Sequence, residues 1–419
     1  MNRGTRAIAS LWFTAAVWWA APAGASLTAH AEQSVHFSDI EGHWAQAPIN
    51  KLVEKGILDG FPDGTFRPND PVTADQFIKM LLLSFTESYK NGERAWTSGF
   101  TQSLSATNQE VLKQDYRDFN FKPSMTGYWA KPFIDLAADL NLVSKTQFAD
   151  FKKNLKREQA AEFIYYTMKE TEHLESESYS LSLTGQLADF QSAKSREQKF
   201  IAESFAKGIM EGYPNGDFGI GRDITRAESL TLLERIADKT KRIQLSSGSG
   251  QGWRMSVPTR DGSYKQLLFP SEKMMNAYDI LLEAAKRRGT NYDMLETTMR
   301  LYKDAETKAK ALNRTPAAVN DLEEAALWLE PEYATYGITV HLAEGVLARN
   351  METIRTFAQY IFGYETLRFE EAFNQAYAKL EQGAPAEDET IVIGDYAVEI
   401  QFDRTRQTVI FSILENNTK

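Results

Sequence analysis

The sequence contains no cysteine, and only five of its 419 residues are histidine. Disulfide bonds and thiolate zinc sites are therefore excluded, so core packing must stabilise the fold. No two histidines stand at the spacing of a metal site, and phosphate-loop and nucleophile-elbow motifs are missing. We therefore expect no catalytic residues, no metal and no cofactor.

The chain also lacks net positive charge, because its 57 acidic residues outnumber its 47 basic residues; the net charge is −10 and the isoelectric point is about 5.3. Such a chain lacks the positive field that attracts nucleic acid or an anionic membrane surface. We expect no nucleic-acid partner, and any anion must be bound by a local pocket.

Long apolar runs are absent except near the N-terminus, where 7–21 is apolar and follows Arg3 and Arg6. This run is shorter than the roughly 18–20 residues of a membrane span, although a single membrane anchor is the alternative interpretation. Small residues within 23–31 fit signal-peptidase cleavage. We interpret 1–31 as a signal peptide, which predicts a secreted chain with no membrane span after cleavage.

Two segments of the sequence share the same motifs at the same spacing, which indicates repeated structural units. Gly-Phe-Pro-Asp-Gly at 60–64 precedes Thr-Ala-Asp-Gln at 73–76, and Gly-Tyr-Pro-Asn-Gly at 212–216 precedes Thr-Arg-Ala-Glu at 225–228. The same number of residues separates Ile49 from Thr73 and Ile201 from Thr225. The first and third copies therefore share one structural plan.

A second, degenerate copy lies between them. Tyr128-Trp129-Ala130 matches His43-Trp44-Ala45, and Lys156-Arg157-Glu158-Gln159 takes the place of the Thr-initiated motifs, but the glycine loop is missing. These motifs resemble the S-layer homology family, whose three repeats fasten bacterial surface proteins to cell-wall polysaccharide. The resemblance covers about half the chain.

The resemblance implies a multidomain chain, in which an α-rich, pseudo-threefold prism of three repeats precedes an α+β domain. Grooves would lie between neighbouring repeats, and a groove would combine the arginine of one repeat with the loop of another. The expected divisions are a signal peptide at 1–31, repeat 1 at 32–86, an irregular insertion at 87–125, repeat 2 at 126–172, repeat 3 at 173–243, a linker at 244–251 and the α+β domain at 252–419.

Arg226 and Arg157 are the sharpest binding candidates. Each lies in the first turn of a predicted helix, where free N–H groups and the helix dipole favour an anion and a guanidinium can grip a carboxylate. The resemblance implies an acidic secondary cell-wall polysaccharide carrying pyruvate ketals. The alternative is that each arginine pairs with an exposed acid. The first copy has Ala74 here, which departs from the family, so we expect its groove to bind weakly or not at all.

Aromatic and loop residues complete the predicted polysaccharide site. Trp44 and Trp129 could stack on sugar rings or lie in the core. The loop residues could contact the ligand or serve only as turn formers, and Glu228 completes a capping box with Thr225. These further candidates are Gly60, Asp63, Gly64, Gly212, Asn215, Gly216 and Glu228.

The sequence pattern of the C-terminal half differs from that of the repeats, because it predicts strands as well as helices. A hairpin is predicted from 253 to 269, helices over 271–288 and 291–312, and strands at 390–393, 396–402 and 408–414. Apolar positions such as Met274 and Tyr278 at helical spacing indicate core packing, or alternatively a groove for a protein or peptide partner.

The sequence therefore predicts a non-enzymatic protein of the bacterial cell wall and surface, with a C-terminal interaction domain. The alternative is an extracellular enzyme tethered by the same repeats, with its active site in 252–419. A lattice-forming protein is disfavoured because the displayed part is small.

Overall fold

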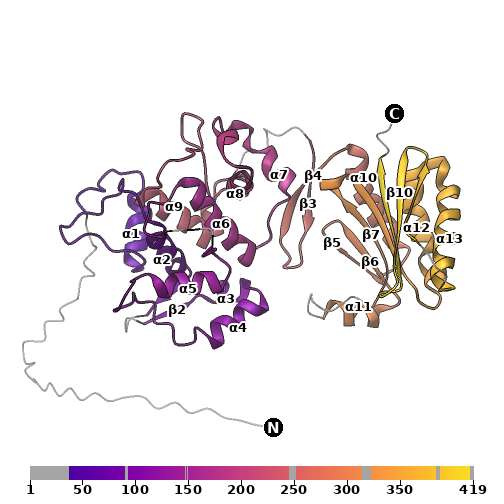
Figure 1. Cartoon of the computed structure of the whole chain (residues 1–419), viewed down its shortest axis with the longest axis horizontal. Helices are drawn as coiled ribbons and strands as arrows, with labels where there is room; N and C mark the ends of the chain where they lie inside the picture. Colours follow the sequence, from indigo (N-terminus) through magenta and orange to yellow (C-terminus); the bar gives the residue numbers. More distant parts are fainter. Residues whose placement is uncertain are drawn as a thin grey trace, which may run out of the picture. The chain divides into compact units, whose positions relative to one another are not determined.

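The computed structural model describes residues 37–89, 93–146, 148, 150–244, 252–313, 322–383 and 387–415. The predicted signal peptide and nearly all of the predicted linker lie outside these residues. Within them, no helix combines the length and apolarity needed to cross a membrane. Helices dominate the first half and a large sheet the second (Figure 1), which confirms the expected multidomain organisation at this level.

Each of the three copies contributes two helices to one shared hydrophobic core. The pairs are α1 (Gln46–Glu54) and α2 (Ala74–Ser84), α5 (Lys131–Asp139) and α6 (Arg157–Thr171), and α8 (Ser195–Ala206) and α9 (Arg226–Ala237). The first helix of each pair ends before a residue with positive φ, namely Gly56 (63°), Asn141 (61°) and Gly208 (65°). Glycine and asparagine tolerate this left-handed conformation, so the degenerate copy retains the same helix stop.

The insertion is more ordered than the irregular segment that we expected. It contains β1 (Thr86–Ser88), β2 (Arg94–Trp96), α3 (Ser98–Ser103) and α4 (Ala106–Gln114). Phe100 stacks on Phe85 at 4.4 Å between ring centres, and Trp96 lies 5.3 Å from Phe100. The aromatic side chains thus join the core of the repeats and order the segment.

Extended segments that precede α2, α6 and α9 meet in a closed ring of hydrogen bonds. The Val72 amide donates to the Ile224 carbonyl at 3.0 Å, Ile224 to Leu155 at 2.9 Å, and Leu155 to Val72 at 2.8 Å. Each copy therefore gives one donor and one acceptor to its neighbours. This ring brings the starts of the three helices together. Three short 3₁₀ turns and α7 (Glu177–Ser182) complete this half in the described residues.

The second half has its own hydrophobic core. After the hairpin of β3 (Trp253–Pro258) and β4 (Tyr264–Phe269), a seven-stranded antiparallel sheet runs in the order β5-β6-β7-β8-β11-β10-β9. Its strands are β5 (Tyr292–Leu295), β6 (Thr298–Tyr302), β7 (Glu323–Glu330), β8 (Thr335–His341), β9 (Glu389–Ile393), β10 (Tyr396–Asp403) and β11 (Thr408–Glu415).

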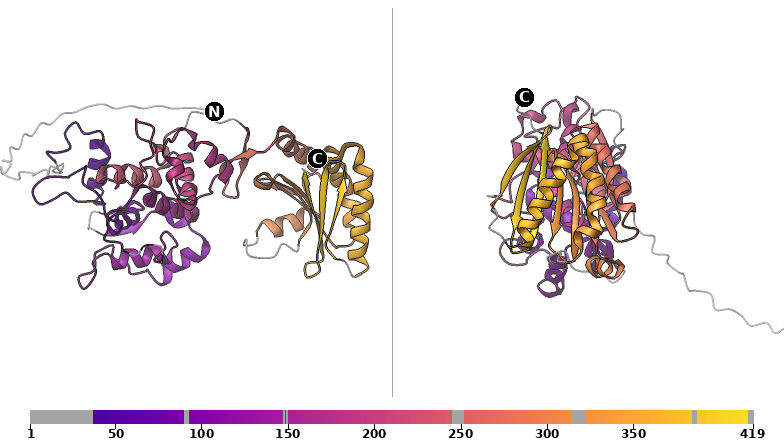
Figure 2. Two further views of the ribbon diagram at one scale, coloured as in Figure 1. Left: turned by 45° about the horizontal axis from the view of Figure 1, so that its top comes forward. Right: turned by 90° about the vertical axis from the view of Figure 1, so that its right-hand side faces the viewer.

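Helices α10 (Glu272–Lys286), α12 (Val346–Phe362) and α13 (Thr366–Glu381) pack on this sheet (Figure 2). The hairpin and the three C-terminal strands are confirmed. The helix predicted over 291–312 is wrong in its first part, where β5 and β6 pair around Glu296 in a positive-φ turn, and only α11 (Ala305–Leu312) is helical.

Candidate functional site

A groove of about 640 Å³ is lined by residues from all three copies. Trp44 comes from the first copy, Arg157 from the second, and Gly212 and Glu228 from the third. The structure therefore brings four of the predicted site residues together. We call this hollow the Arg157 groove. Its lining also includes residues that the sequence did not single out, chiefly Asn69, Tyr213, Thr231 and Arg235.

All three guanidinium nitrogens of Arg157 bind protein acceptors, and the residue is only 5% exposed. Nε donates to the Phe218 carbonyl at 2.8 Å and Nη2 to the Glu211 carbonyl at 2.9 Å. Nη1 donates to Oε1 of Glu228 at 3.1 Å. The Tyr213 hydroxyl donates to the same oxygen at 2.6 Å, and its ring lies 4.5 Å from the guanidinium carbon. Burial and this bond to a carboxylate raise the pKa of Tyr213.

Arg226 occupies an equivalent seat against the loop of the first copy. Nε donates to the Phe66 carbonyl at 3.0 Å and Nη2 to the Asp59 carbonyl at 3.1 Å. The guanidinium carbon lies 5.0 Å from the centre of the Phe61 ring. Burial lowers the pKa of Arg226, although an arginine remains charged at neutral pH. The described residues place no carboxylate within ion-pair distance of it.

The backbone at the starts of these helices differs from our expectation. The Arg226 amide donates to the Asp70 carbonyl at 2.9 Å, and the Arg157 amide donates to the Arg222 carbonyl at 2.9 Å. The Ala74 amide donates to Lys153 at 3.1 Å, so Ala74 faces the copy that lacks a glycine loop. The prediction of free N–H groups is therefore wrong for the first residue of each helix, because neighbouring copies supply the acceptors.

The loop glycines are explained by the protein's own conformation. A Cβ added at Gly60 would lie 2.0 Å from the Phe37 ring, and one at Gly212 would lie 2.9 Å from Leu187. Gly64 and Gly216 have φ of 79° and 87°, which side chains rarely adopt. Gly60 and Gly212 thus allow an apolar residue to pack beneath each loop.

The polar loop residues bond within their own loops. Oδ1 of Asp63 accepts from the Thr65 amide and hydroxyl, and Oδ2 pairs with Arg67 at 2.7 Å. Hydrogen bonds from Thr65 and Arg67 lower the pKa of Asp63 to about 2. Asn215 similarly bonds to Asp217. These contacts fix the shape of each loop.

Two aspartates that the sequence did not assign to the site organise the loops. Asp189 accepts from the amides of Phe218 at 2.6 Å and of Gly219 and Ile220 at 2.8 Å. Asp39 likewise accepts from Phe66 and Arg67 in the first copy. The sequence pattern that could have identified these aspartates is the pair of similar motifs Phe37-Ser-Asp39 and Leu187-Ala-Asp189.

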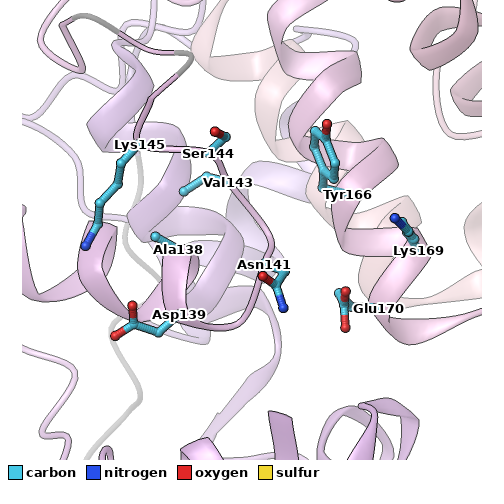
Figure 3. A pocket seen from close by; sticks show the side chains of 9 residues that line it. All are labelled: Ala138, Asp139, Asn141, Val143, Ser144, Lys145, Tyr166, Lys169 and Glu170. Atoms are coloured by element: carbon cyan, nitrogen blue, oxygen red, sulfur yellow. The ribbon is translucent and has the colours of Figure 1, made fainter. Parts of the chain in front are cut away.

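The degenerate copy forms a different hollow, of about 600 Å³. Figure 3 shows Tyr166, Lys169 and Glu170 of α6 across from 138–145, which spans the end of α5 and the segment after it. None of the predicted site residues lines it. Trp129 is half-buried at the start of α5, and its carbonyl accepts from the Ser124 amide at 2.9 Å. Trp129 therefore lies apart from the Arg157 groove.

Comparison with known proteins matches the S-layer homology domain to residues 36–78 and 189–228. The chain is 35% identical over 96 residues to S-layer protein EA1 of Bacillus anthracis, covering 21% of this chain and 11% of that protein. It is 43% identical over 54 residues to the cellulosome-anchoring protein of Acetivibrio thermocellus, covering 13% and 12%.

A third relative is an endoglucanase of a Bacillus species (strain KSM-635), which is 27% identical over 211 residues, 48% of this chain and 19% of the enzyme. The chain thus spans between about a tenth and a fifth of the length of these relatives. The two matched segments coincide with the first and third copies, and these two repeats belong to the S-layer homology family.

Proposed function

We propose that this chain is a secreted protein of the bacterial cell surface, held non-covalently to acidic secondary cell-wall polysaccharide by its N-terminal repeats. The observation that carries the proposal is the Arg157 groove, where Trp44, Arg157 and Glu228 converge from three separate copies. Its aromatic and polar lining suits a sugar, because rings stack on aromatic faces while hydroxyl groups find hydrogen-bond partners.

The proposal includes a pseudo-threefold prism of repeats. It is supported by the ring of hydrogen bonds that joins Val72, Leu155 and Ile224, since each copy uses the same position in the same way. It is also supported by the equivalent seating of Arg157 and Arg226 against loops of the following copies. The third equivalent position holds Ala74 and faces no glycine loop, so two of the three positions keep an arginine for binding.

The acidic group of the polysaccharide is proposed to be a pyruvate ketal. A guanidinium can grip its carboxylate by charge-assisted hydrogen bonds. The C-terminal α+β domain is proposed to be the displayed part, which would bind a protein or peptide partner without catalysing a reaction.

Co-sedimentation tests the anchoring. The chain should pellet with purified cell walls and remain in solution when the secondary polysaccharide has been extracted from the same walls. Equal sedimentation with extracted walls would show that the chain recognises peptidoglycan or sediments nonspecifically.

A tethered enzyme is the second candidate, favoured by the similarity to the endoglucanase. In that case a polysaccharide hydrolase activity would reside in 252–419. Assays on soluble β-glucans with the full chain decide between the two. Turnover that survives changes at Arg226 would establish the enzyme, and no turnover would support the interaction domain.

A further inference from the structure

We infer that the two arginine seats have different ligands: Arg226 binds the carboxylate of the glycan, and the Arg157 groove binds an uncharged sugar unit. This assignment of different ligands to the two arginines rests on the proposed function. It follows from a comparison of the two arginine seats, which share one backbone frame but differ in the side chains around the guanidinium.

The shared frame is defined by equivalent hydrogen bonds. Arg157 donates through Nε and Nη2 to the carbonyls of Phe218 and Glu211, and Arg226 donates through the same nitrogens to those of Phe66 and Asp59. The residues of the third-copy loop are offset by a constant number of positions from those of the first-copy loop. The same offset relates Tyr213 to Phe61, Glu228 to Gln76 and Arg235 to Leu83.

Every formal charge that lines the Arg157 groove is paired. Arg157 contacts Glu228 at 3.1 Å, and Arg235 contacts Glu211 at 3.1 Å. Two cations and two anions thus neutralise one another within the lining. A carboxylate entering this groove would meet Glu228 next to Arg157 and would gain little from either. Arg157 is therefore a positioning residue that holds the loop.

The remaining surface of the Arg157 groove suits an uncharged ring. Trp44 is 63% exposed and lines the groove beside Tyr213. Thr225, Thr231 and Asn69 add polar groups without net charge. Aromatic faces with scattered hydroxyl and amide groups match the alternating apolar and hydroxyl surfaces of a sugar.

The Arg226 seat lacks both neutralising partners. Gln76 is the sequence equivalent of Glu228, and its amide oxygen accepts from the Thr73 amide at 3.2 Å. Phe61 replaces Tyr213 and has no hydroxyl. Within the described residues, Nη1 of Arg226 has no hydrogen-bond partner, so it can donate to a ligand.

Acidic residues do lie near Arg226, namely Asp39, Asp59 and Asp70. All three are exposed, and none comes within ion-pair distance of the guanidinium in the described structure. Water screens such exposed charges, whereas a carboxylate in direct contact with a buried guanidinium interacts strongly. The net attraction for a ligand carboxylate therefore survives at Arg226 and not at Arg157.

A reciprocal exchange of two residues tests the inference. Glu228→Gln frees Arg157, and Gln76→Glu gives Arg226 a counter-charge. Both variants keep the N3 capping bond, because Gln76 and Gln159 cap their helices with glutamine oxygens and Glu228 caps α9 with a carboxylate oxygen. Each variant's free energy of unfolding is measured first, and a change within about 1 kcal/mol is acceptable for mutation of one contact.

The probe is sodium propionate, with propionamide as the uncharged control. The arginine Nε–H signals of the full chain are followed by ¹H–¹⁵N NMR and assigned from Arg226→Lys and Arg157→Lys spectra. Propionate, and not propionamide, should shift the Arg226 signal of the parent. Glu228→Gln should tighten propionate binding at Arg157 at least about tenfold, and Gln76→Glu should weaken it at Arg226 by a similar factor. An equal response of both arginines in the parent, or no gain in Glu228→Gln, would overturn the inference.

Purified wall polysaccharide links this result to the proposed function. The parent should bind the native polymer at least about tenfold more tightly than a carboxyl-reduced polymer, and Gln76→Glu should remove that preference. If the parent binds neither polymer, the proposed function fails while the propionate titration still decides the inference. If it binds both polymers equally, the carboxylate assignment of Arg226 is wrong even though anchoring stands.

Discussion

Asp189 offers a stringent test of how the loop of the third copy is built. Its carboxylate accepts three backbone N–H groups, and the Phe218 residue that it holds also presents its carbonyl to Arg157. In Asp189→Asn the amide has one accepting oxygen, so its NH₂ group must face at least one N–H donor. A hydrogen bond to a charged acceptor contributes roughly 1.5–3 kcal/mol, and we expect a loss of about 2 kcal/mol because Asp189 is only half-buried.

The assay is urea unfolding of the parent and the variant at pH 7. Asp118→Asn is the matched control, because Asp118 stands in the insertion, is exposed, and bonds to its neighbour Arg117. This control should change the free energy of unfolding by less than about 0.5 kcal/mol. Equal effects of the two substitutions would refute the role of Asp189 in the loop.

The pH dependence gives a second check on the same residue. Burial opposes the charged form, but hydrogen bonds from Ile220, Phe218 and Gly219 outweigh it and lower the pKa of Asp189. A lowered folded-state pKa adds stability that is present above the unfolded value of about 3.9 and is lost as the pH falls through the folded value. The difference between parent and Asp189→Asn should therefore be full at pH 7 and shrink below about pH 4.

Three other predictions concern single side chains. Gly60→Ala should lower the free energy of unfolding in urea more than Gly64→Ala does, because only the Cβ at position 60 collides with Phe37. Gly64→Ala should cost about 1–2 kcal/mol through its positive φ alone. Trp44→Ala should change the free energy of unfolding by less than about 0.5 kcal/mol, since Trp44 is largely exposed, yet weaken polysaccharide binding in co-sedimentation. Burial raises the pKa of Glu203 to about 7, so parent stability should fall as the pH rises from about 4.5 to 7, and Glu203→Gln should flatten that slope in pH-dependent unfolding.

Local sequence signals predicted local structure well. The Thr225–Glu228 capping box forms with both of its bonds, and the hairpin at 253–269 and the three final strands lie where alternation placed them. The first part of the helix predicted over 291–312 is wrong because Tyr292, Met294, Met299 and Leu301 fit strand positions in a hairpin equally well. Pairing with β7 decided that ambiguity, and it is a long-range contact.

The sequence predicted several residues of the candidate site, but not how they come together in the folded chain. The motifs identified Arg157, Trp44, Gly212 and Glu228, but their convergence depends on how three copies pack. The same holds for the helix starts, whose N–H groups are used by neighbouring copies instead of remaining free. Glu228 was recognised for its cap, and its second contact with Arg157 is visible only in the folded chain.

Titration of purified secondary wall polysaccharide into the chain tests the central claim most directly. Arg226→Ala removes a charge-assisted contact of about 1.5–3 kcal/mol, so the dissociation constant should rise roughly ten- to a hundredfold. Arg157→Ala should raise it less, and Arg368→Ala, an exposed arginine of the C-terminal domain, should leave it unchanged. If Arg226→Ala folds like the parent and binds the polysaccharide with the same affinity, Arg226 does not recognise the wall polysaccharide and the account is contradicted.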